Sequence, residues 1–123
     1  MRLAMGLVLG LALSGVAQAD TTKIEEDVNR LIAATRLSDA RTLYGRDPVV
    51  TAYINGVIHG LFTQNKLGAV TGSWCPPEGV VINVDVVFLA IHSDQNGAED
   101  SEYLANFGSL ALKGLERMFP CGA

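Results

Sequence analysis

The sequence predicts an all-α fold, a small bundle of about four helices with one disulfide, after a cleaved signal peptide. Three observations indicate this. Residues 1–19 have the make-up of an export signal. Apolar residues in the rest of the chain recur mostly at helical intervals. Two cysteines, Cys75 and Cys121, bracket the last third of the chain, and an exported protein would join them.

The N-terminal segment has the layout of a cleavable signal peptide. One basic residue, Arg2, precedes an apolar run, and Ala-Gln-Ala stands before Asp20. The run is shorter than the roughly 20 apolar residues of a membrane-spanning helix, and no stop-transfer pattern follows it. We therefore expect residues 20–123 to be released as one soluble periplasmic domain, without membrane contact after cleavage.

The first half of this domain predicts two helices. Apolar residues at helical spacing place the first over about residues 22–37. The second is expected over about residues 48–64, because Asp47 can cap it and Pro48 suits the first helical position. Residues 66–80 contain glycines and two prolines, so we expect a connection there.

The second half is expected to hold two more helices. Residues 80–91 are rich in β-branched side chains that would also suit a buried strand, but helical spacing favours a helix over about residues 83–92. A polar turn follows over residues 93–98. The clearest amphipathic pattern in the chain predicts the last helix over about residues 100–119, and Pro120 ends it.

We interpret Cys75 and Cys121 as a structural disulfide. The bridge would close a loop of roughly 46 residues, for which the chain-entropy estimate is about 4 kcal/mol. A redox-active pair would need two cysteines close in sequence and a perturbed thiolate, and the sequence shows neither feature.

Composition and motifs argue against several functions. Without Arg2 the domain has 8 basic against 13 acidic side chains, so nucleic acid is not an expected partner. His59 and His92 lack companions at metal-ligand spacing, so we expect no metal site. Ser73 or Ser109 with His59 could form a hydrolase pair, but no nucleophile signature supports it. We therefore expect neither an enzyme nor a cofactor.

Two features could serve a binding role. Trp74 precedes a cysteine in a connection, where a rigid aromatic side chain could anchor a partner, or it could cover the end of the core. The polar turn, extended to residues 93–100, could reach into a partner's cleft or be an ordinary helix connection. The candidate contact residues are Asp94, Gln95, Asn96, Glu99, Asp100 and Trp74.

Three segments in order carry a family resemblance: Ala-Tyr-Ile-Asn-Gly-Val at 52–57, Cys-Pro-Pro-Glu-Gly-Val at 75–80 and Phe-Pro-Cys at 119–121. Together they resemble the periplasmic Rap/Tai immunity family of type VI secretion systems, over about residues 47–122. The resemblance implies an all-helical, disulfide-bonded homodimer that occludes a secreted peptidoglycan amidase with a loop between helices, here residues 93–100. Many relatives have a further cysteine where residues 49–52 have none, so a second disulfide is not expected.

A second hypothesis keeps the same scaffold without a dedicated amidase. The chain would then be a small periplasmic stress or chaperone-like protein, which binds many clients weakly as carboxylates protonate. An amidase-like gene beside this one favours the immunity hypothesis, and its absence favours the other.

Overall fold

The computed structural model describes residues 21–67 and 73–122. The signal peptide expected over residues 1–19 lies outside the described residues. The chain divides into two compact units at Leu31, and the helical stretch 21–34 runs across that division. The described part contains helices, one isolated β-bridge and no strand, so the predicted all-α fold is confirmed. None of its helices has the length and apolar character needed to cross a membrane.

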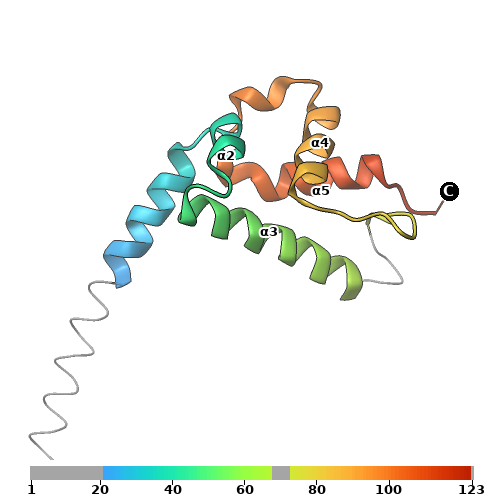
Figure 1. Ribbon diagram of the computed structural model, residues 1–123, viewed down its shortest axis with the longest axis horizontal. Coiled ribbons are helices and arrows are strands. Elements are labelled where there is room, and N and C mark those ends of the chain that lie inside the picture. Colours follow the sequence, from blue (N-terminus) through green and yellow to red (C-terminus); the bar gives the residue numbers. More distant parts are fainter. Residues whose placement is uncertain (1–20, 68–72, 123) are drawn as a thin grey trace, which may run out of the picture. The chain divides into compact units, whose positions relative to one another are not determined.

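The second unit contains four α-helices and two short 3-10 helices within its described residues (Figure 1). In chain order they are α2 (Leu37–Leu43), α3 (Pro48–Leu67), α4 (Val84–Gln95), η1 (Ala98–Ser101), η2 (Leu104–Asn106) and α5 (Phe107–Met118). The helix pair α4 and α5 packs most extensively, and η1 contacts both α2 and α4. Helix α2 was not predicted as a separate element.

The helix expected over residues 22–37 is wrong at its end, because the helical stretch stops at residue 34. Arg36 is extended, with φ −72° and ψ 150°, and forms an antiparallel bridge with Tyr103. The backbone N–H of Leu37 donates to the carbonyl of Glu102 at 2.8 Å. These long-range contacts replace helical hydrogen bonds, and α2 therefore begins anew at Leu37.

The same bridge moves the start of the last helix, which we expected near Asp100, to Phe107. The chain turns extended at Glu102 and Tyr103 between η1 and η2. Leu104 is fully buried, and its N–H donates to the carbonyl of Thr35 at 2.8 Å. This segment is thus tied to the core by backbone hydrogen bonds as well as by a buried side chain.

Helix α3 confirms the second predicted helix, three residues longer than expected. The Asp47 carboxylate accepts the N–H groups of Val49 and Val50 at 2.9 and 3.0 Å, and Pro48 occupies the first helical position. Asp47 therefore satisfies backbone donors that have no partner within the helix. The buried face of α3 consists of Val50, Ile54, Ile58 and Leu61.

Helix α4 confirms the helical interpretation of residues 83–92, although it continues to Gln95. Asn83 caps it by accepting the N–H of Val86 at 3.0 Å. Helices α4 and α5 approach closely at Gly114, where an added Cβ would lie 2.7 Å from the backbone C and O atoms of Ala90. The shared core of the two helices includes Val87, Phe88, Ile91, Phe107, Ala111 and Leu115.

The predicted disulfide between Cys75 and Cys121 is confirmed, with 5.0 Å between their Cα atoms. The N–H of Cys75 also donates to the carbonyl of Phe119 at 2.7 Å. The bridge and this hydrogen bond join the connection after α3 to the end of α5. They join the two ends of the last third of the chain to each other.

Candidate functional site

The structure divides the polar turn expected over residues 93–100 into three parts. Its first three residues complete the last turn of α4. Asn96 and Gly97 then adopt left-handed conformations, with φ 54° and 87°, and end the helix. The remainder belongs to η1. The turn itself is therefore only Asn96 and Gly97, and the wider loop prediction is wrong in its extent.

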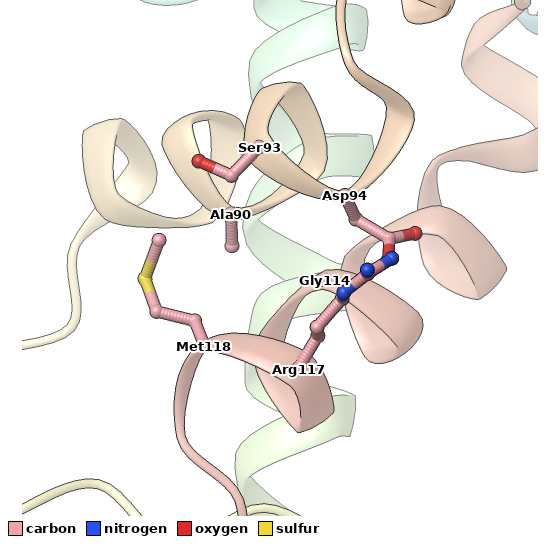
Figure 2. Close-up of a pocket in the computed structure, with 6 residues that line it drawn as sticks. All are labelled: Ala90, Ser93, Asp94, Gly114, Arg117 and Met118. Carbon is pink, nitrogen blue, oxygen red and sulfur yellow. The ribbon is translucent and has the colours of Figure 1, made fainter.

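Asp94, one of the predicted contact residues, is mostly buried and paired. Its side chain is 8% exposed, and its Oδ1 accepts a hydrogen bond from Nη1 of Arg117 in α5 at 3.2 Å. The amide of Gln95 donates to the other oxygen at 3.1 Å. Figure 2 shows the Arg117 side chain reaching across to Asp94 at the edge of a small pocket. That pocket, of about 230 Å³, is lined by Ala90, Ser93, Asp94, Gly114, Arg117 and Met118.

We expect Arg117→Ala to lower the free energy of unfolding by about 1 kcal/mol. Removing the guanidinium takes away one of the hydrogen bonds of a largely buried carboxylate, although the exposure of Arg117 itself limits the loss. Urea denaturation would measure it. Lys113→Ala, on the same helix and exposed, is the matched control and should change stability by less than about 0.5 kcal/mol. Equal effects of the two variants would contradict a stabilising role for the pair.

Glu99 is also paired within the chain. Its side chain is 12% exposed and contacts Nδ1 of His92, so η1 is fastened to α4. Burial of the carboxyl raises its pKa. Hydrogen bonds from His92 and from the backbone of Glu99 and Gly97, together with attraction to charged His92, outweigh burial, and the pKa of Glu99 lies below its ordinary 4.5. The pairing of His92 was not visible in the sequence, because the bond depends on how η1 folds back.

This contact predicts a pH dependence. Because the folded state lowers the pKa of Glu99, its ionised form contributes stability above the ordinary pKa, and that contribution is lost as pH falls through the folded value. The difference in free energy of unfolding between the wild type and Glu99→Gln should therefore be fully present above the ordinary pKa of 4.5 and shrink as the pH falls through the lower folded value. Asp100→Asn is the control. A difference that grows towards acid pH would refute the assignment.

Asn96 and Asp100 are the predicted contact residues that remain exposed, whereas Gln95 is half-buried. Trp74 is only 1% exposed. Its ring packs edge-on against Phe62, with 5.4 Å between centroids, and Asn65 hydrogen-bonds its backbone carbonyl at 2.8 Å. Trp74 thus covers the end of the core, and the surface anchor considered for it is wrong.

The described residues contain no group of three His, Cys, Asp or Glu side chains placed to hold a metal ion. Comparisons with protein-family models, with curated proteins and with solved structures find no significant match to this chain. The short turn at Asn96 lies between Asp94 and Glu99, whose largely buried carboxylates are both paired within the chain.

Proposed function

We propose that the chain is a periplasmic immunity-type protein that binds and occludes a peptidoglycan amidase effector of a type VI secretion system. The observation that carries this proposal is the junction of its two most specific segments. Residues 75–80 and 119–121 are far apart in sequence, yet the disulfide and the bond from the Cys75 N–H to the Phe119 carbonyl unite them. Two of the three segments behind the Rap/Tai resemblance thus meet at one place in an all-α fold, which supports the resemblance.

The turn after α4 supplies the contact surface in this proposal. Asp94 anchors one side of it to α5, and Glu99 anchors the other side to α4. Asn96 and Asp100 stay exposed between and beside these anchors. A turn that is already ordered loses little conformational entropy when it docks into an enzyme's cleft. We therefore assign the direct contacts to Asn96 and Asp100, and the shape of the turn to Asp94, Gln95 and Glu99.

A reconstitution with the product of any amidase-like gene found beside this one tests the proposal. The oxidised chain serves as bait, once with the purified gene product and once with whole periplasmic extract. Quantitative mass spectrometry identifies the proteins that it retains. The proposal predicts one amidase at a stoichiometric amount. Asp100→Lys should weaken its retention, whereas Asp85→Lys, the same charge change at the other end of α4, should not. If both variants retained the amidase equally, the turn would not be the interface.

The stress or chaperone-like function remains the second candidate, and exposed apolar side chains are the observation that favours it. Val81 is 77% exposed and Leu89 is 54% exposed. Such side chains could bind unfolded clients. Many retained proteins in sub-stoichiometric amounts, or an absence of any amidase beside the gene, would support this function and contradict the immunity proposal.

A homodimer belongs to the immunity proposal, because the resemblance implies one. Light scattering on the oxidised chain at micromolar concentration tests it directly. A mass of twice the chain would support the dimer. A mass equal to one chain at that concentration would contradict the dimer. The reconstitution would still test amidase binding.

A further inference from the structure

A second pocket lies between α2, α4 and η1, and it has an apolar floor. Leu37 is 1% exposed and Phe88 is 6% exposed, and both line it. Its volume is about 290 Å³, near the lower end for small-molecule sites. The remaining lining residues are polar or charged: Ser38, Arg41, His92, Glu99 and Asp100. A pocket of this size suits a ligand no larger than an amino acid or a dipeptide.

The pocket presents two charges of opposite sign that are not paired with each other. The Arg41 guanidinium lies 5.7 Å from the centroid of the Phe88 ring, which is a cation–π contact. In the described part of the chain Arg41 forms no ion pair, and neither does Asp100. His92 and Glu99 are already bonded to each other. One free cation on α2 and one free anion on η1 thus face the same apolar floor.

We propose that this pocket binds a small zwitterion, such as a free amino acid or a dipeptide. Its carboxylate would meet Arg41, whose planar fork of donors matches a carboxylate and is held over Phe88. Its ammonium group would meet Asp100, with the Glu99 carboxylate adding negative potential at the same end. Its aliphatic part would cover Leu37 and Phe88. A ligand with one charge leaves the other protein charge unmatched, so it binds more weakly.

Titration of the oxidised, isotope-labelled chain followed by NMR tests this proposal and needs no amidase. The probe is alanylalanine, compared with N-acetylalanine, which keeps only the carboxylate, and with alaninamide, which keeps only the cation. We expect saturable amide shifts for residues 38–41 and 99–101 with the dipeptide. Each single-charge analogue should bind at least about tenfold more weakly, because each loses a charge-assisted hydrogen bond.

Variants locate the site. Arg41→Gln, which keeps part of the aliphatic stem, and Asp100→Asn should each weaken dipeptide binding about tenfold. Arg36→Ala is the matched control: Arg36 is also exposed and lies 5.8 Å from the centroid of the Tyr103 ring, but it does not line the pocket. Three results would each overturn the proposal. They are binding of either single-charge analogue as tight as that of alanylalanine, unchanged dipeptide binding by Arg41→Gln, and an absence of saturable shifts with alanylalanine.

Discussion

Gly114→Ala is expected to destabilise the fold by about 2 kcal/mol. In most helices this change would stabilise the protein by about 1 kcal/mol, because alanine has the higher helix propensity. Here the new methyl group would lie 2.7 Å from the backbone C and O atoms of Ala90 and 2.9 Å from the backbone N of Ile91. Backbone atoms cannot move aside as a flexible side chain can, so α4 and α5 must separate, and overpacking of this kind costs up to about 3 kcal/mol.

Thermal denaturation followed by circular dichroism would measure the effect, with an expected fall in Tm of about 10 °C. Gly56→Ala is the matched control. Gly56 lies within α3 and is exposed, and a Cβ added there would have no heavy atom of the surrounding structure within 4 Å. Its replacement should raise stability by about 0.5–1 kcal/mol. If both variants were stabilised alike, the close crossing at Gly114 would be refuted.

Loss of the disulfide is expected to have the largest effect on stability. The bridge joins residues 46 positions apart, and the chain-entropy estimate for such a loop is about 4 kcal/mol. That is a large share of the ~5–15 kcal/mol stability of a small domain. The double variant Cys75→Ser, Cys121→Ser should therefore unfold at much lower urea concentration than the oxidised wild type.

Fluorescence of the single tryptophan provides the readout, because Trp74 is buried beside Cys75. The reduced wild type should unfold like the double variant, and reductant should leave the double variant unchanged. Coincident denaturation curves for oxidised and reduced wild type would mean that the bridge contributes nothing to stability.

Local patterns were enough to predict much of the fold. The capping Asp47, the apolar face of α3, the helical spacing in α4 and the cysteine pair each act within short stretches or through covalent chemistry. The early end of the first helical stretch and the late start of α5 have a single cause, the bridge between Arg36 and Tyr103. No local pattern signals a contact between residues so far apart. By contrast, Asn-Gly at 96–97 is a recognisable helix stop that could have placed the end of α4.

The sequence indicated which residues form the candidate site, but not which of them are paired within the chain and which are exposed. Asp94, Glu99 and Asp100 look alike in sequence, yet the first two are fastened to Arg117 and His92 and only Asp100 is exposed. Those partners come from other elements, so tertiary packing decides which acid is available.

The most direct test of the immunity proposal is inhibition of an amidase, taken from any amidase-like gene found beside this one. Purified amidase would be mixed with increasing oxidised chain, and the release of cell-wall fragments from peptidoglycan would be measured. We predict complete inhibition near one equivalent, weakened by Asp100→Lys and retained by Asp85→Lys. Full amidase activity in the presence of excess oxidised chain would contradict the proposal.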